Sequence, residues 1–410
     1  MEEAIVRIRL LEPGRAQHAP AGLIGALALV LAVEAWLGRS PAMPESRSRL
    51  DASWQTAMER ASGPEAGAEI LAFGDSLIKL GILPRVLEAR LGCTAYNLAV
   101  LGGGPPTSHA LLRRVLDAGH RPRLIVVSFS PLLLGMDPRT NLNWWCRLLD
   151  ARERFELAWR SRDPRFAAPL LVEGALASRG YAEVFRDLVG LSAFTTPHEG
   201  ERMEPDELRT LLRNWQINRG AQVAPRQFVP IAGALPRPFH GPQWSWQPHP
   251  AHADHVERFL DLAQQRGIPV YWVLTPADAL WLERNTRAGT VSSYRRFVEG
   301  QAARFANLTV LDGQRTTWDR ALFRDPIHLN RDGAVRLSLA VADSIGRDRG
   351  RDQRQDTSAP IAQRWITLDE AAGPATASRG YQKLLEDLDQ SRLAVNRAEH
   401  DPITMEGPRS

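Results

Sequence analysis

The residues best suited to covalent chemistry are Ser76, Asp325 and His328. Ser76 closes the sequence Gly74-Asp75-Ser76, which follows a short apolar run and precedes an amphipathic, helix-like segment. A serine at such a strand-to-helix turn exposes its hydroxyl for attack, and its own N–H can stabilise an oxyanion. Asp325 lies three residues before His328, so its carboxylate can hold the imidazole in the tautomer that accepts the serine proton. The residue types and spacing therefore predict acyl transfer through a triad of these three residues.

An alternation of strand-like and helix-like segments surrounds the three residues. The expected strands are 70–73, 94–98, 124–129, 268–274 and 308–311, and the expected helices are 84–91, 108–118, 255–266, 292–305 and 332–345. Strands that alternate with helices predict right-handed crossovers and an α/β fold with a parallel, doubly wound sheet, here over residues 69–346. The carboxyl ends of parallel strands meet at one edge, so residues far apart in sequence can form one site there.

Between residues 136 and 252 the alternation stops. Helical pieces are expected over 151–160, 180–191 and 205–218, and a segment rich in Pro, Trp and His follows. This stretch is too long for a structureless loop in a compact domain, so it predicts a mostly helical insertion that forms a lid or a substrate groove. Trp244 and Trp246 could stack on sugar rings, although packing is the favoured interpretation because tryptophan usually fills cores.

The amino-terminal region carries an apolar run at residues 19–37. About 19 residues approach the ~20 that span a bilayer, and three arginines precede them. This arrangement predicts a transmembrane signal anchor, with residues 1–18 cytoplasmic and the folded domain outside the cell membrane. A cleaved signal peptide and a buried soluble helix are the alternatives.

Two further segments are expected to lie outside the domain. Residues 38–68 are rich in Pro, Ser, Ala and Gly, and predict a linker with one short helix. Residues 347–410 are polar and low in aromatics, and predict a largely disordered tail with one helix at 381–394.

The composition argues against nucleic-acid binding, a disulfide framework and a metal site. The net charge of +4 comes without a dense basic stripe, which argues against nucleic-acid binding. Cys93 and Cys146 are too few for a disulfide framework or a zinc site; two buried thiols are favoured over one bridge. Four histidines match no standard zinc spacing, so we expect no metal and interpret them as surface or loop residues: His240, His249, His252 and His255.

The motifs together resemble those of the SGNH/GDSL hydrolase superfamily. Gly74-Asp75-Ser76-Leu77 resembles the first block, residues 97–102 (NLAVLG) resemble the second, and Asp325-Pro-Ile-His328 resembles the last. Residues 95–131 more narrowly resemble the membrane-associated branch, which includes alginate O-acetylation proteins and the D-alanylation protein of teichoic acids. The similarity covers about residues 69–135 and 252–346.

The resemblance implies a flavodoxin-like, three-layer SGNH fold and a role for each block. Ser76 would be the nucleophile, and the N–H groups of Ser76 and Gly102 would hold the oxyanion, with Gly103 and Ser130 as alternative donors. The family places an asparagine after the third strand to complete the oxyanion hole, but residues 128–131 read Ser-Phe-Ser-Pro. Asn141 or Asn143 could fold back to take that place.

The expected function is therefore an SGNH-type serine esterase or O-acyltransferase that uses no cofactor. The branch resemblance implies acyl esters of a cell-surface polysaccharide as substrates, outside the membrane and beside a membrane-bound acyltransferase. Water would resolve the acyl-enzyme in an esterase, and a sugar hydroxyl would do so in a transferase. The alternative is a catalytically inactive SGNH-like protein that binds glycan or acts as a scaffold in a polysaccharide synthesis complex, which the missing asparagine motivates.

Overall fold

The structure, a computed structural model, describes residues 19–39, 48–174, 176, 203–224, 246–352 and 365–368. Its contacts divide the chain into two compact units. The sheet and the candidate site lie in the unit formed by Ser46–Leu171 and His198–Ser410. The other unit comprises Met1–Glu45 and Val172–Pro197.

One sheet of six parallel strands forms the centre of the larger unit, in the order β2-β1-β3-β4-β5-β6. The strands are β1 (Ile70–Gly74), β2 (Ala95–Asn97), β3 (Leu124–Ser128), β4 (Val270–Leu274), β5 (Leu308–Asp312) and β6 (Trp365–Thr367). Every pairing between neighbours is parallel. The predicted α/β fold with a parallel sheet is confirmed, and so are the five predicted strands.

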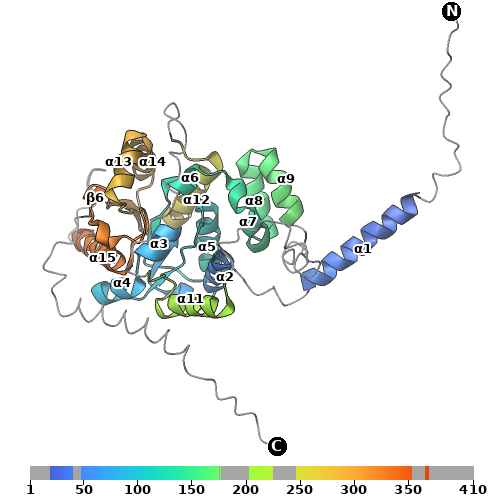
Figure 1. Cartoon of the computed structure of the whole chain (residues 1–410), viewed down its shortest axis with the longest axis horizontal. Coiled ribbons are helices and arrows are strands. Elements are labelled where there is room, and N and C mark those ends of the chain that lie inside the picture. Colours follow the sequence, from blue (N-terminus) through green and yellow to red (C-terminus); the bar gives the residue numbers. More distant parts are fainter. Residues whose placement is uncertain are drawn as a thin grey trace, which may run out of the picture. The chain divides into compact units, whose positions relative to one another are not determined.

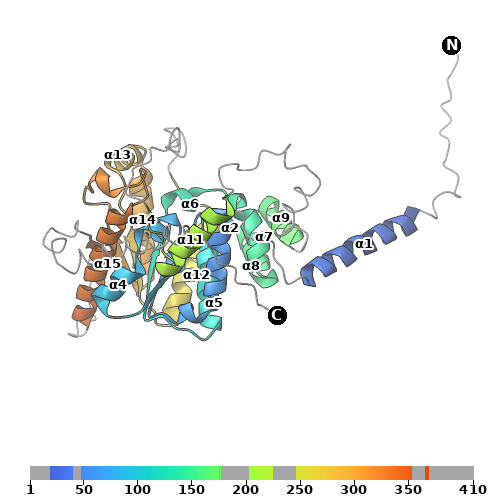
Figure 2. The same cartoon turned by 60° about the horizontal axis from the view of Figure 1, so that its bottom comes forward.

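The central strands β1, β3 and β4 are buried at every position, so both faces of the sheet need a helical layer. Alternation along β1 directs Leu71 and Phe73 into one core and Ile70 and Ala72 into the other. Helices cover both cores, and Figure 2 shows α4 and α15 on one side of the sheet and α5 and α12 on the other. The sheet is therefore doubly wound in three layers.

The helices around the sheet follow in chain order (Figure 1). They are α2 (Arg49–Arg60), η1 (Pro64–Gly67), α3 (Ser76–Gly81), α4 (Pro84–Leu91), α5 (Pro105–Asp117), α12 (Pro250–Gln265), α13 (Ala279–Arg287), α14 (Thr290–Arg304), η5 (Arg320–Leu322) and α15 (Arg331–Asp352). The region expected as an insertion contributes α6 (Pro131–Gly135), η2 (Pro138–Asn141), α7 (Leu142–Leu148), α8 (Ala151–Ser161), α9 (Pro164–Gly174) and α11 (Pro205–Ile217). Its described part is mostly helical, as predicted, whereas the helix expected over 180–191 lies outside the described residues.

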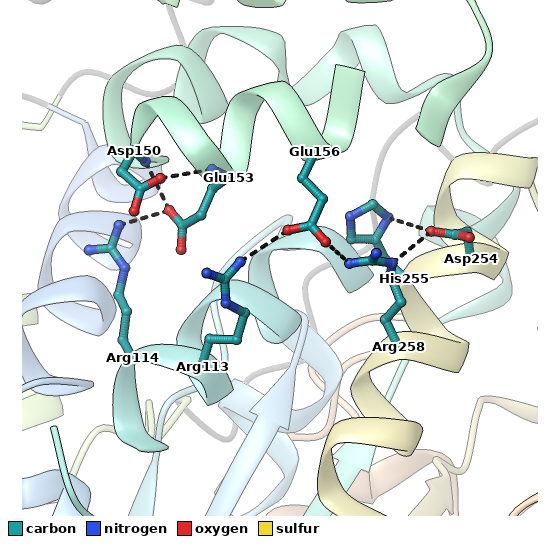
Figure 3. Close-up of polar contacts among 8 residues, drawn as sticks. All are labelled: Arg113, Arg114, Asp150, Glu153, Glu156, Asp254, His255 and Arg258. Atoms are coloured by element: carbon teal, nitrogen blue, oxygen red, sulfur yellow. Dashed lines mark hydrogen bonds and ion pairs between the residues drawn. The ribbon is translucent and has the colours of Figure 1, made fainter. Parts of the chain in front are cut away.

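Ion pairs join the insertion helix α8 to the layer that packs on the sheet (Figure 3). The Glu156 carboxylate contacts Arg113 of α5 and Arg258 of α12. Glu153 contacts Arg114 at 3.1 Å and completes a capping box with Asp150 at the start of α8. Trp246 is also buried and donates to the carbonyl of Pro131 at 2.9 Å, which confirms packing as its role; Trp244 lies outside the described residues.

The folded unit begins earlier than the sequence suggests, because α2 lies within the stretch expected as a linker. Trp54 of α2 is fully buried, and its Nε1 donates to the Leu101 carbonyl at 3.0 Å. Ser53 Oγ accepts from the Leu101 N–H at 3.0 Å. The boundary expected at residue 68 is therefore wrong. Pro, Ser and Gly in this stretch favour loops. The small residues Ala52, Ser53 and Ala57 nevertheless lie in a helix, and their size allows the helix to pack closely.

The expected tail also contributes to the fold. β6 pairs with β5 at the sheet edge, and Trp365 Nε1 donates to Asp312 Oδ2 at 3.0 Å. Arg295 forms a bidentate ion pair with the same buried carboxylate, with N–O distances of 2.6 and 2.8 Å. Residues 365–368 are thus part of the folded unit, a contribution that the prediction of a largely disordered tail did not include. The helix expected over 381–394 lies outside the described residues.

The amino-terminal helix α1 (Ala19–Arg39) occupies the run predicted as a signal anchor. Among the described residues, no helix combines the length and the apolar character needed to cross a membrane. The anchor, the cytoplasmic segment 1–18 and the location at the cell membrane stay predictions.

Both cysteines are free thiols, as the favoured interpretation had it. Cys146 is buried and Cys93 is half-buried. Burial raises the pKa of the Cys93 thiol, which makes the reactive thiolate scarcer.

Four histidines lie near the seam between α5 and α12: His109, His252 and His255 are buried, and His249 is half-buried. The rings of His109 and His255 lie 5.7 Å apart, and those of His249 and His252 lie 5.9 Å apart. Burial lowers the pKa of His109 and of His252 to about 3, and it also lowers the pKa of His249 and His255. The expectation of surface or loop histidines is therefore wrong for His252 and His255, while His240 lies outside the described residues. No group of described residues has the composition of a metal site.

Acidification should therefore destabilise the protein. The unfolded chain protonates these histidines near pH 6.5, whereas the buried rings of His109 and His252 stay neutral down to about pH 3. Stability is full above pH 6.5 and falls below it, by about 2 kcal/mol per histidine at pH 5. Urea unfolding at pH 7.5 and pH 5 measures the loss. The variant His109→Phe should lose about 2 kcal/mol less between the two pH values; an unchanged loss would contradict the assignment.

Candidate active site

The turn after β1 brings that strand very close to β3. Gly74 has φ +135°, and a Cβ at this position would lie 2.2 Å from the Ser128 carbonyl oxygen, so only glycine fits. Asp75 then caps α3, accepting from the Leu77 N–H at 2.8 Å, and Ser76 is the first residue of the helix. Because β2 and β3 flank β1 on opposite sides, Ser76 lies at the switch point of the sheet, where sites in such folds form.

The structure brings the three predicted triad residues together. His328 Nε2 lies 2.8 Å from Ser76 Oγ, and His328 Nδ1 lies 2.8 Å from Asp325 Oδ2 and 3.0 Å from Asp325 Oδ1. These distances are those of a nucleophile, a general base and an orienting carboxylate. The imidazole can therefore accept the serine proton through one nitrogen while the carboxylate fixes the other.

The surroundings of Asp325 favour its ionised form. Burial opposes its charge, but hydrogen bonds from the His328 ring and the attraction of that ring outweigh it. The N–H groups of Ile327 and His328 also donate to Oδ1, at 3.1 and 2.9 Å. Together they hold the pKa of Asp325 below its usual range, so a carboxylate faces Nδ1 at neutral pH.

Asn330 shapes the turn that carries the acid and the base. Its side chain donates to the Ala321 carbonyl and accepts from the N–H groups of Asp332 and Gly333, where α15 begins. Gly333 is required there, because a Cβ would lie 2.1 Å from the Leu322 carbonyl oxygen. These contacts fix the turn against α15. The sequence alone predicts no role for Asn330.

Asp75 joins the two turns at the carboxyl ends of β1 and β3. Besides the Leu77 N–H, it accepts from the Ser130 N–H at 2.9 Å through its second oxygen. Burial raises its pKa, and the two backbone donors act against that rise. The side chain is thus a buried bridge between backbone segments.

The three candidate oxyanion donors beside Ser76 differ in their surroundings. Gly102 lines the same cavity as Ser76 and His328, and its N–H, like that of Ser76, donates to no group among the described residues. The Gly103 N–H already donates to the Val100 carbonyl at 2.9 Å. The Ser130 N–H donates to Asp75, and its hydroxyl caps α6. Gly102 is therefore the best placed of the three.

The asparagines in this region act as supports. Asn141 Nδ2 donates to the Gly102 carbonyl at 3.0 Å and so braces the loop, and Asn143 is exposed. The buried Asn97 donates to the carbonyls of Ile78 and Ile82, both at 2.9 Å. Neither Asn97, Asn141 nor Asn143 lines the cavity that contains Ser76.

The cavity at the triad has a volume of about 500 Å³, within the range of small-molecule sites. Besides triad residues and Gly102, it is lined by Arg49 and Leu50 of α2, by Met203 and Glu207 at the start of the α11 region, and by Arg324. Its surface is about half polar, which suits a hydroxyl-rich group. The sequence does not identify Arg49, Leu50, Met203 and Glu207, because they lie in the expected linker and insertion, where no motif marks them.

A second, smaller cavity of about 40 Å³ lies at the ends of β3 and β4. Leu77 and Ile327, the chain neighbours of the nucleophile and the base, line it together with Ser130 and Tyr294. Ser130 thus faces a different space from Ser76 and Gly102.

Comparison with models of known protein families finds no match to this chain. Comparison with curated proteins finds no match either.

Replacing Asp75 should destabilise the turn beneath the site. Asp75→Ala leaves the buried Ser130 N–H and the partly buried Leu77 N–H without an acceptor, which should cost about 2–4 kcal/mol of unfolding free energy. Asp319→Ala is a matched control, since Asp319 also caps through the N–H two residues on but is exposed, and it should cost about 1 kcal/mol. Urea unfolding distinguishes them, and equal losses would contradict the bridging role.

Proposed function

We propose that this protein is a serine esterase or O-acyltransferase that works through an acyl-enzyme on Ser76. The observation that carries the proposal is the continuous hydrogen-bonded line from Ser76 Oγ through His328 to Asp325, with both links at 2.8 Å. A serine that merely caps a helix would not need a braced imidazole at its hydroxyl.

The proposed reaction begins when Ser76 Oγ attacks the carbonyl carbon of an acyl ester. His328 Nε2 accepts the hydroxyl proton, and the N–H groups of Ser76 and Gly102 stabilise the tetrahedral oxyanion. The ester C–O bond then breaks, and His328 returns the proton to the departing alkoxide oxygen. Water or a second alcohol then loses its proton to His328 and attacks the carbonyl carbon of the acyl-enzyme. The bond from that carbon to Ser76 Oγ breaks, and His328 returns the proton to Oγ. Asp325 keeps Nδ1 protonated throughout.

We further propose that the chain is a member of the SGNH/GDSL superfamily that acts on acylated carbohydrate. The sequence blocks around Ser76, Gly102 and His328 support the family. The charged residues Arg49, Glu207 and Arg324 in the lining of the cavity support the substrate class. The resemblance of residues 95–131 supports a cell-surface polymer as substrate and a membrane-bound acyltransferase as partner.

A second candidate is an inactive SGNH-like domain that binds glycan or organises a synthesis complex. It is favoured by one observation, which is that Ser130 stands where the family has its oxyanion asparagine and does not line the triad cavity. Loss of one oxyanion donor costs about 10²–10³ in rate.

Labelling of the full-length protein with a fluorophosphonate probe separates the two candidates. The wild type should label at its serine, and Ser76→Ala and His328→Ala should abolish labelling because the nucleophile or its base is gone. Asp325→Asn should slow labelling by about three to four orders of magnitude, since the imidazole then presents the wrong tautomer.

The control is Ser292→Ala, which removes an exposed serine from the first turn of α14 and should label like the wild type. Circular dichroism confirms that each variant is folded. If the folded wild-type protein is not labelled, the enzyme proposal is contradicted and the inactive binding domain is favoured.

A further inference from the structure

Two aromatic side chains are exposed next to each other on the insertion helix α8. Phe155 is 59% exposed and Trp159 is 75% exposed, and their rings lie 6.3 Å apart and nearly parallel, at 17°. Among the described residues of the larger unit, every other phenylalanine and tryptophan is buried or half-buried. Because aromatic side chains gain much from being covered, a neighbouring pair left in water on a folded unit indicates an interaction surface.

The packing of α8 holds this pair outward. Leu157 of the same helix is buried in the core. The two glutamates of α8, Glu153 and Glu156, form ion pairs with arginines of α5 and α12 (Figure 3). A rotation of α8 that buried the aromatic pair would break these ion pairs and expose Leu157. The exposure of the two rings is therefore built into the fold.

The outer face of α8, formed by Arg152, Phe155 and Trp159, is basic as well as aromatic. These three positions follow one another at intervals of three and four residues, so they share one side of the helix. Arg152 is exposed and has no ion pair with any residue that the structure describes.

The charges of the surrounding segment are also predominantly positive. Residues 150–165 contain five arginines and four acidic residues. Two of these acidic residues, Glu153 and Glu156, are neutralised by arginines of the neighbouring helices α5 and α12. The segment therefore keeps a net positive charge beside the two exposed rings.

The hydrogen-bonding groups of the outer face indicate what it binds. The exposed side chains of α8 are those of Ala151, Arg152, Phe155, Trp159 and Arg160, and none of them accepts a hydrogen bond. Sugar hydroxyls both donate and accept, so a glycan would leave donors unpaired here. Phosphate oxygens only accept, which matches the guanidinium group. Aromatic side chains beside arginine are typical of surfaces that lie at the boundary between lipid headgroups and acyl chains.

A protein partner fits this face less well than a lipid surface. A stable interface between proteins covers about 800 Å² on each partner around a buried apolar centre. Two neighbouring rings surrounded by arginines offer only a small part of that area. A bilayer needs no matching shape, because headgroups rearrange around the side chains that enter them.

We propose that the outer face of α8 binds the surface of an anionic lipid bilayer, with Phe155 and Trp159 between the headgroups and Arg152 on lipid phosphates. None of these three residues lines the triad cavity, so the contact does not depend on the chemistry of Ser76. It is also additional to the signal anchor expected at residues 19–37, and its test has to report on α8 alone.

A polarity-sensitive dye attached to α8 of the full-length protein gives such a local signal. Ala151→Cys places a thiol on the first residue of α8 and leaves the aromatic pair intact, while Cys93→Ser and Cys146→Ala remove the other two thiols. Ala279→Cys is the matched control, because Ala279 is also an exposed alanine that begins a helix. Its helix α13 lies on the opposite side of the larger unit in both views (Figures 1 and 2).

Vesicles of phosphatidylcholine and phosphatidylglycerol should shift the emission of the dye at position 151 to shorter wavelengths, and spin-labelled lipid should quench it. The dye at position 279 should not respond. The double variant Phe155→Ser, Trp159→Ser should lose the response, because the side chains that enter the headgroup layer are gone. Circular dichroism confirms that each variant is folded.

The contribution of charge is measured with single arginine variants. Arg152→Gln should lower the ratio of lipid-bound to free α8 about fivefold, which is the effect of one arginine near an anionic surface. Arg296→Gln removes an exposed arginine of α14 and should leave the ratio unchanged. Vesicles of phosphatidylcholine alone should give a much weaker response than the anionic vesicles.

Several outcomes would overturn the proposal. They are no response at position 151, equal responses at positions 151 and 279, and equal responses to neutral and anionic vesicles. A shift that grows with protein concentration without vesicles would assign the face to a second copy of the chain instead, and a shift caused by dextran would assign it to a glycan. Ser76→Ala should respond like the wild type, so failure of this proposal and failure of the enzyme proposal are distinguishable.

Discussion

The close approach of β1 to β3 at Gly74 is the constraint on which the site depends. No side chain can stand between Gly74 and the Ser128 carbonyl, so the two strands end at nearly the same point. The Asp75 carboxylate then accepts one backbone hydrogen bond from the turn after β1 and one from the turn after β3. This buried bridge fixes the first turn of α3, and with it the hydroxyl that the imidazole of His328 meets.

Elements outside the doubly wound core complete the cavity around this centre. The first helix of the larger unit brings Arg49, and the insertion brings Met203 and Glu207, so the alternating β-α units alone would leave the triad open on that side. In the proposed function, chemistry and recognition are therefore carried by different parts of the chain. Ser76, His328 and Asp325 belong to the regular fold, whereas the additional cavity walls belong to segments with little pattern of their own.

This division explains what the sequence could predict. The five strands and the Ser76, His328 and Asp325 constellation follow from short apolar runs and local motifs, and the structure brings them together. A short helix was expected between residues 38 and 68, but its place in the folded unit was not, because the burial of α2 depends on partners such as Leu101 that no local pattern shows. His252 and His255 were expected at the surface or in loops for the same reason, although both are buried. Residues such as Arg49 and Glu207 become neighbours of Ser76 only through tertiary packing, so spacing could not identify them.

The last strand has a consequence for assembly of the chain. β6 follows α15 in sequence, so β5 has an unpaired edge until nearly the whole domain has been synthesised. During that interval the edge could pair with a strand of another molecule, which is the usual route to aggregation of open sheets. The buried Asp312 at the end of β5 is an obstacle to such pairing, because a foreign strand would lack the Trp365 indole that joins Arg295 on its carboxylate. The charge of Asp312 at the end of β5 thus favours pairing with β6 over pairing with a strand of another molecule.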